Sequence, residues 1–120
     1  MKRDMDLFRE ILVSIEEQPA GAYWTAKPLL EYSIQDVVAH VRLINDAGLV
    51  EARFLTSMNA DGAIVLRITN AGYDFLEASR QKTLWEQAKH QLVANGVPLT
   101  VATIRAVLQK LIEGAIANLH

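Results

Sequence analysis

The stretch that most constrains the fold is Ser33–Val50, because it carries a helix start signal, a helical period and a stop in succession. Ser33 is placed to be an N-cap, and Asp36 three residues later favours the positive end of a helix. Gly48 suits the left-handed position that follows a helix, and Leu49 supplies the hydrophobic residue that commonly closes such an end. The segment therefore predicts one well-delimited helix.

This helix has two distinct faces at about 100° per residue. The apolar face holds Ile34, Val37, Val41, Ile44 and Ala47, with His40 at its edge. We expect this face to be core, with Val41 and Ile44 almost fully buried. The opposite stripe holds Gln35, Ala39, Arg42 and Asp46. This stripe is the surface that the helix would present to DNA or to another partner.

Two further elements are expected before this helix. Residues 4–18 repeat apolar side chains at helical spacing, and Pro19 and Gly21 end that first helix. Residues 22–32 are too short for another helix with its connections, and aromatic and β-branched residues there favour a strand. Pro28 suggests that this strand lies at a sheet edge. The helix that usually precedes the second helix of a helix-turn-helix is therefore expected to be short or missing.

A β-hairpin is expected after the central helix. Val50–Ser57 and Ala63–Thr69 are β-prone, and Asp61-Gly62 between them is a strong turn signal, which places the turn near Asn59–Gly62. The alternation predicts one buried face made of Val50, Ala52, Phe54, Ile64, Leu66 and Ile68. Arg53 and Arg67 lie along the two strands, away from the tip.

The remainder of the chain is predicted to be helical. Thr69 is the expected N-cap of the next helix, whose Gly72 favours close packing, and its expected inward side chains are Tyr73, Phe75 and Leu76. Thr83–Glu86 has the capping-box form, so a second helix starts there unless one helix runs unbroken over residues 70–94. Asn95-Gly96 and Pro98 force a stop, and Thr100 or Thr103 caps the last helix.

The order helix, strand, helix, hairpin, helix resembles the winged-helix superfamily. The segments MKRDMDLFREIL, HVRLINDAGLVEA and RITNAGYDFLEASRQKTLWEQAK resemble, in this order, the bacterial and prophage family known as domain of unknown function 2513. The resemblance implies an α+β, mostly α fold: a winged helix-turn-helix with a two-stranded wing and a C-terminal helical extension. We expect a winged-helix core over residues 1–80 and a helical extension over residues 81–120, packed as a single domain. No established activity comes with the resemblance.

Charge argues against a strongly attractive surface for nucleic acid. The net charge is −2, and residues 1–62 hold six Lys and Arg against ten Asp and Glu, whereas residues 63–120 hold six against four. The absence of cysteine fits a reducing compartment. The charged N-terminus lacks the apolar run of a signal peptide, and no apolar stretch approaches a membrane span. We therefore expect a cytoplasmic protein with no membrane association.

The sequence carries no recognised catalytic or metal-binding motif. Its histidines, at positions 40, 90 and 120, have no partner at a known ligand spacing. His40 is expected to be a core-edge residue bonded to a neighbouring element, and His90 to lie on a solvated helix face. We therefore expect no enzyme activity, no cofactor and no metal.

Two functional hypotheses remain. A winged helix can place its recognition helix in the major groove of double-stranded DNA, with Gln35 and Arg42 reading base edges. The cations available to support it are Lys2, Arg3, Arg9, Lys27, Arg53 and Arg67. The alternative is a protein-interaction module that uses the winged helix as a scaffold. Trp24 and Trp85 are candidate anchors for that contact, and core packing is the commoner fate of a tryptophan.

The last helix predicts a homodimer. Twelve of residues 101–119 are apolar, which is more than one stripe requires. Taking Leu108 as reference, Ile104, Leu111, Ile112, Ala115 and Leu119 form a packing side. The surplus residues Val101, Val107 and Ile116 are the expected dimer interface. The alternative is that this helix is sandwiched between the first helix and the 70–94 segment of its own chain.

Overall fold

The computed structural model describes residues 1–57 and 61–119. Over these residues the chain has a mostly helical α+β fold with a small antiparallel sheet. The elements are α1 (Met5–Glu16), β1 (Trp24–Thr25), α2 (Ile34–Asp46), β2 (Val50–Thr56), β3 (Asp61–Ile68), α3 (Asn70–Ser79), α4 (Lys82–Ala94) and α5 (Val101–Ala117). Two compact units result, Met1–Tyr73 and Asp74–His120, and the division between them falls inside α3.

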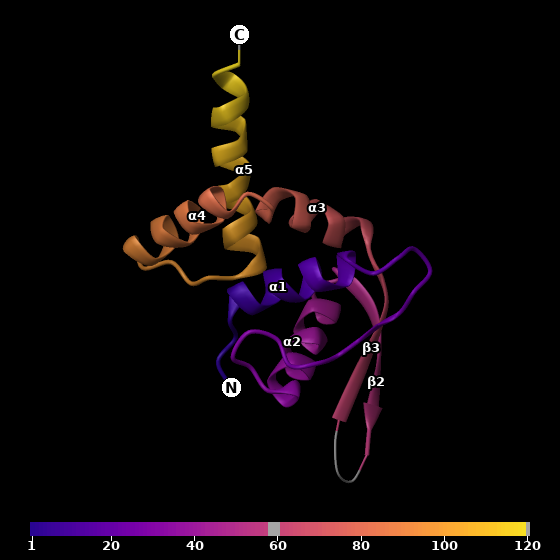
Figure 1. Ribbon diagram of the computed structural model, residues 1–120. Helices are drawn as coiled ribbons and strands as arrows, with labels where there is room; N and C mark the ends of the chain where they lie inside the picture. Colours follow the sequence, from indigo (N-terminus) through magenta and orange to yellow (C-terminus); the bar gives the residue numbers. More distant parts are fainter. Residues whose placement is uncertain (58–60, 120) are drawn as a thin grey trace. The chain divides into compact units, whose positions relative to one another are not determined.

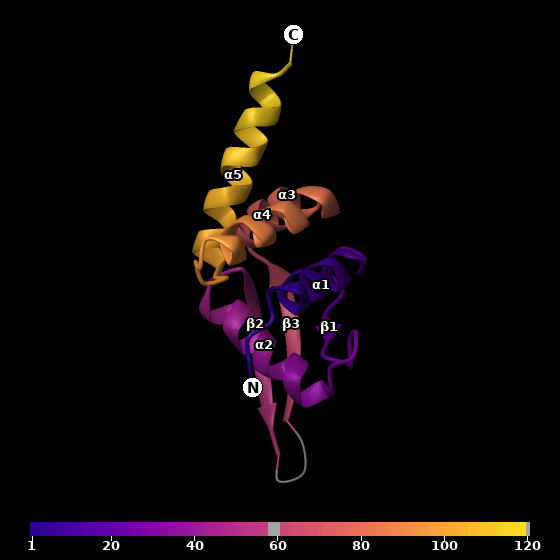
Figure 2. The ribbon, with the colours of Figure 1, turned by 90° about the vertical axis from the view of Figure 1, so that its left-hand side faces the viewer.

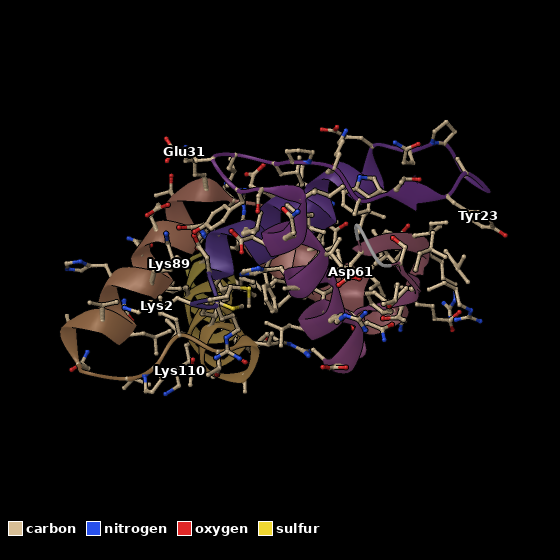
Figure 3. The ribbon with its side chains drawn as sticks, turned by 90° about the horizontal axis from the view of Figure 1, so that it is seen from below. Lys2, Tyr23, Glu31, Asp61, Lys89 and Lys110 are labelled. Atoms are coloured by element: carbon tan, nitrogen blue, oxygen red, sulfur yellow. The ribbon has the colours of Figure 1, made fainter. Side chains whose placement is uncertain are left out.

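The sheet of the first unit has the strand order β1-β3-β2, with β1 at one edge (Figure 2). Trp24 of β1 pairs with Val65 of β3, and Tyr23 just before it points outward with 64% of its surface exposed (Figure 3). α1 contacts α2 and β3, and α2 contacts both strands of the hairpin (Figure 1). The expected edge strand is confirmed. Residues 26–33 contain no helix, which agrees with the expectation that a helix before α2 is short or missing.

Both ends of α2 are capped as the sequence predicts. The Ser33 hydroxyl accepts a hydrogen bond from the Asp36 N–H at 3.3 Å. Gly48 has a φ of +78°, and the Leu49 N–H donates to the carbonyl of Ile44 at 3.1 Å. These are the left-handed residue and the long-range backbone bond of a Schellman end. Glycine is required at position 48 because a side chain would strain this backbone conformation.

The predicted burial of the inward face of α2 is confirmed at the centre of the helix and is wrong at its C-terminal end. Val41 and Ile44 are fully buried, with 0% of their surface exposed. Ala47 is exposed, and Val38 is buried in its place. Ala47 stands about 120° around the helix from Val41, whereas Val38 stands only about 60° from it. The apolar arc is therefore narrower on one side than the sequence pattern suggests.

The hairpin is longer than expected. Asp61 pairs with Thr56 and Gly62 pairs with Leu55, so both residues lie within β3 and not in a turn. The predicted turn position is wrong for these two residues, because ladder pairing continues through them. Asn59, the other residue named for the turn, lies outside the described residues.

A β-bulge changes which residues of β3 are buried. Glu51 pairs with Arg67 while Ala52 pairs with Val65, so Leu66 is the extra residue. An unpaired residue reverses the in-out alternation of a strand. The buried residues of β3 are Ala63, Val65 and Ile68. Ile64 and Leu66, which were predicted to point inward, are only half-buried, so the predicted alternation is wrong for these two residues. On β2, Val50 and Ala52 are buried as expected, and Phe54 is half-buried.

Ala52, at the register shift, is bonded through its backbone to two side chains. The Ala52 N–H donates to the Asn45 side-chain oxygen at 3.1 Å. The Ala52 carbonyl accepts from the Arg53 guanidinium at 3.3 Å. The backbone N–H and C=O of Ala52 are thus both bonded to side chains. β2, the strand that contains Ala52, pairs with another strand on one side only. The edge strand is closed at this position by its own chain.

The helices after the hairpin partly follow the prediction. α3 ends at Ser79 and α4 begins at Lys82, so the helix is broken and the unbroken alternative is wrong. Gln81 is the N-cap of α4 and makes no side-chain cap bond, so the Thr83 capping box is also wrong. Phe75 and Leu76 are fully buried as expected, whereas Tyr73 is 44% exposed. The buried arc of α3 also includes Gly72 and Ser79, which turns Tyr73 to its edge.

In the second unit, α5 packs on α4 and begins at a well-formed cap. The Thr103 N–H donates to the Thr100 hydroxyl at 3.0 Å, and the Thr100 N–H donates to the Thr103 hydroxyl at 2.9 Å. Trp85 is buried edge-to-face against Phe75, with ring centroids 6.1 Å apart. Because Trp24 and Trp85 are each only 1% exposed, both are core residues and neither anchors a surface contact.

Gly72 and Gly114 give a matched test of packing around helical glycines. A Cβ at Gly72 would lie 2.0 Å from the Leu49 carbonyl oxygen, whereas a Cβ at Gly114 would meet nothing within 4 Å. We expect Gly72→Ala to lower the free energy of unfolding by several kcal/mol and Gly114→Ala to raise it by about 0.5–1 kcal/mol. Urea denaturation of both variants checks this. Equal effects of the two substitutions would contradict the close approach at Gly72.

The core position of α2 gives a second stability prediction. Ile44→Ala is expected to lower the free energy of unfolding by about 2–4 kcal/mol, through lost burial and the cavity left behind. Gln35→Ala, on the exposed face of the same helix, is the control and should change it by less than about 0.5 kcal/mol. Thermal or urea unfolding followed by circular dichroism measures both. A small effect at Ile44 would mean that α2 is not anchored by this face.

Candidate functional site

The outward face of α2 brings the predicted site residues of this helix together. Gln35, Arg42 and Asp46 are exposed, and Ala39 is half-buried between them. The helix that carries them is anchored through its buried face and capped at both ends. These side chains therefore project from a fixed backbone, which is what recognition of a rigid partner requires.

Arg42 is positioned by an aromatic ring of the hairpin. Its guanidinium carbon lies 4.2 Å from the centroid of the Phe54 ring, within the range of a cation–π interaction. Phe54 is on β2, and its side chain lies on the same face of the strand as Ala52. The contact places the charged end of Arg42 where α2 meets the hairpin. Sequence spacing gave no signal for this pair, because its two residues belong to different elements.

Arg53 and Arg67 lie on a different surface from Arg42. Alternation along β2 turns Glu51 and Arg53 to the face opposite Ala52, and Arg67 is paired with Glu51 across the strands. The Arg67 guanidinium is 2.7 Å from the Glu51 carboxylate. That hydrogen bond lowers the pKa of Glu51 and raises the pKa of Arg67. The predicted site residues therefore occupy two faces of the unit, and the charge of Arg67 is largely balanced.

The N-terminal segment is attached to the buried side of α2. The Asp4 N–H donates to Nε2 of His40 at 2.9 Å, which attaches the chain just before α1 to the middle of α2. Lys2 and Arg3 immediately precede this attachment, and both are exposed. His40 stands about 140° around the helix from Gln35, so this attachment lies away from the outward face, which carries Arg42. Arg9 pairs with Glu10 at 3.3 Å.

His40 is a structural residue that joins two elements, as the sequence predicts. It is fully buried, its Nδ1–H donates to the Asp36 carbonyl at 2.8 Å, and its Nε2 accepts from Asp4. This pattern requires the neutral tautomer with the proton on Nδ1. The Tyr32 hydroxyl donates to the Asp4 carboxylate, which raises the pKa of Tyr32 above its ordinary value near 10. Sequence reasoning did not find the Tyr32–Asp4 pair, since its two residues are 28 positions apart in the chain.

The chemistry offered by this surface is recognition by hydrogen bonds. Gln35 presents an amide and Arg42 a guanidinium, and both ring nitrogens of His40 are already bonded.

Among the described residues, no group of three or more His, Cys, Asp or Glu is arranged to hold a metal ion. His90 is exposed on α4. A hollow of about 120 Å³ beside the end of α1 is lined by Glu16, Arg67 and Tyr73 among others. None of the helices in the described part of the chain has the length and apolar character of a membrane span.

The Tyr32–Asp4 hydrogen bond predicts a pH dependence of stability. Because the folded state raises the pKa of Tyr32, the bond stabilises the fold below about pH 10 and this contribution is lost as the pH rises through the folded-state pKa. The free energy of unfolding should therefore fall more steeply between about pH 9 and pH 11 in the wild type than in Tyr32→Phe. Tyr23→Phe, at an exposed position, is the control and should behave as the wild type. Identical alkaline slopes for all three proteins would contradict the bond.

Comparison with known proteins gives the relationship of the chain but no activity. The family model described as Hypothetical protein (DUF2513) matches residues 2–98. An uncharacterized protein of Haemophilus influenzae is 30% identical over 118 residues, which cover 98% of this chain and 100% of that protein. No solved structure matches the chain. On the family match and this relative, the chain belongs to the DUF2513 family.

Proposed function

We propose that residues 1–73 form a winged-helix unit that binds double-stranded DNA, with α2 as the recognition helix and the β2–β3 hairpin as the wing. The order of elements supports this, as does the antiparallel pairing of β1 with β3 beside the hairpin. The observation that carries the proposal is the division of α2 into two faces. Val41 and Ile44 are fully buried, while Gln35 and Arg42 are exposed on the outward face.

The position of Arg42 suits base recognition. Its guanidinium carbon lies 4.2 Å from the Phe54 ring centroid, and a guanidinium in such a contact still has N–H donors for a second partner. Arginine pairs with guanine O6 and N7, and glutamine pairs with adenine N6 and N7, in a major groove about 12 Å wide that admits a helix. Gln35 lies two helical turns before Arg42 on the same stripe. The two side chains therefore contact successive parts of one groove.

The electrostatics of this unit predict weak binding. Residues 1–73 hold seven Lys and Arg against ten Asp and Glu, a net charge of −3. Asp46 is one turn from Arg42 and repels a nearby phosphate. Lys2 and Arg3 precede the attachment at His40, on the side of α2 away from this stripe, so Arg42 is the cation that the stripe itself supplies. With so few phosphate contacts, the logarithm of the binding constant should fall with the logarithm of salt concentration at a slope of only about −2 to −3.

Titration of a fluorescent duplex library with the full chain tests the proposal. Arg42→Ala is expected to weaken binding at low salt by at least about tenfold, the loss of one bidentate base contact. Arg53→Ala, on the opposite face of the hairpin, is the matched control and should stay within about twofold of the wild type. Absence of binding at micromolar protein and low salt would overturn the proposal. Equal losses in both variants would place the contact elsewhere.

A protein-interaction role is the second candidate. The specific observation in its favour is the net negative charge of residues 1–73, which repels nucleic acid and suits a protein partner with a basic surface. In this role the unit is a scaffold and no duplex is bound. Both roles act on cytoplasmic partners. A folded protein that shows no duplex binding at low salt would favour this second role.

A further inference from the structure

We propose that the C-terminal half of α5 is a self-association surface that pairs antiparallel with α5 of a second copy, about a two-fold axis near Ala115. This surface, called here the α5 seam, consists of Leu111, Ile112, Ala115, Ile116 and Leu119. The proposal goes beyond DNA binding, because it concerns the second unit and uses none of the residues of α2. It stands or falls independently of the proposed function.

The first observation is that one apolar stripe of α5 is only half covered. Leu108, Ile112, Ala115 and Leu119 follow one another at spacings of four, three and four, the repeat of a coiled-coil seam. Ile104 and Leu108 are fully buried, and Ile112 is half-buried. Ala115 is exposed, and Leu119 has 74% of its surface exposed. The stripe therefore continues beyond the packing that its own chain supplies.

The arrangement of the second unit explains this change. α4 lies beside the first half of α5, and the last turns of α5 extend past α4 in both views (Figures 1 and 2). Ile116 is 60% exposed beside the stripe. Of the residues expected at a dimer interface, Val101 and Val107 are half-buried, and only Ile116 is strongly exposed. The interface inferred from the structure thus lies nearer the C-terminus than the sequence suggests.

The charge pattern favours a second copy as the occupant. Residues 114–119 contain no Lys, Arg, Asp or Glu, and the last charged residue before them, Glu113, points away from the stripe. A charged partner would find no opposite charge on this surface. A second α5 brings no like charge against it and offers the same apolar spacing. A two-fold pairing therefore buries apolar groups from both copies without desolvating an unpaired charge.

Steric considerations favour the antiparallel direction. Because α4 occupies the first half of α5, only residues from Leu111 onward are available to overlap. An antiparallel overlap centred on Ala115 sets Leu111 of one copy opposite Leu119 of the other and keeps the two α4 helices at opposite ends. Ala115, at the centre of this overlap, is small and exposed. The helices are therefore able to approach closely at the crossing point.

The size of the surface sets the strength of the contact. Stable complexes commonly bury about 800 Å² on each partner, and five side chains on two helical turns supply less than that. We therefore expect association in the micromolar range or weaker, visible as a mass that rises with concentration. This expectation also defines the concentrations at which the experiment must be done.

Two identical substitutions at different positions test the α5 seam. Ala115→Glu places a charge in the seam, and Ala106→Glu places the same charge on the far side of the same helix; both alanines are exposed in the single chain. Light scattering and sedimentation of the full chain are measured from about 1 µM to about 1 mM. The wild type and Ala106→Glu should dimerise alike, and Ala115→Glu should raise the dissociation constant at least about tenfold.

Each other result overturns the proposal. A wild type that stays at 13.4 kDa over the whole range has no such contact. A dimer that survives Ala115→Glu uses another surface, and equal loss in both variants shows a general effect of charge. Thermal unfolding of dilute protein separates a further case: if Ala115→Glu alone lowers the melting temperature of a monomer, the seam is covered by its own chain.

Cysteine cross-linking tests the two-fold axis directly, since the chain contains no cysteine. Ala115→Cys should form a disulfide-linked dimer on mild oxidation, and Ala106→Cys should not. Leu119→Cys alone should fail to cross-link, because in the antiparallel arrangement it faces Leu111 of the other copy. Efficient cross-linking at position 119 alone would show a parallel pairing and overturn the proposed geometry.

Discussion

Burial of one face of α2 is the interaction on which the first unit depends. Val41 and Ile44 have no exposed surface, and they hold the helix against the hairpin and α1. Every candidate site residue on α2 takes its direction from this burial, because side chains on a helix are fixed relative to one another. The caps at Ser33 and Gly48 set its length. The His40–Asp4 hydrogen bond then attaches the start of the chain to the same helix.

Local signals in the sequence were sufficient for most element boundaries. Ser33, Gly48 and the Thr100–Thr103 pair act within a few residues of themselves, so the sequence identifies them correctly. The packing role of Gly72 was also predictable, because glycine weakens a helix and its presence in a first turn therefore indicates a close approach. Errors arose where a distant partner decides the outcome. The extra residue at Leu66 is a property of two paired strands, and alternation within one strand does not reveal it.

In the candidate site too, the features set by local sequence were predictable and those set by distant partners were not. The outward stripe of α2 could be read from helical periodicity, since exposure follows directly from the position of the apolar face. The partners of its charges could not, because they come from other elements: Phe54 lies against Arg42, and Glu51 neutralises Arg67. Counting cations along the chain therefore overstates the charge available at one surface.

The side chains around Ala52 bear on how this protein avoids misassembly. An exposed edge strand offers its backbone to any extended chain, and that pairing is the usual first step of sheet aggregation. Here the amide of Ala52 is held by Asn45 and its carbonyl by Arg53, so an incoming strand would have to displace two bonds before gaining any. Asn45 belongs to α2 itself. The helix that carries the candidate recognition surface thus also keeps β2 from acting as a template for other chains.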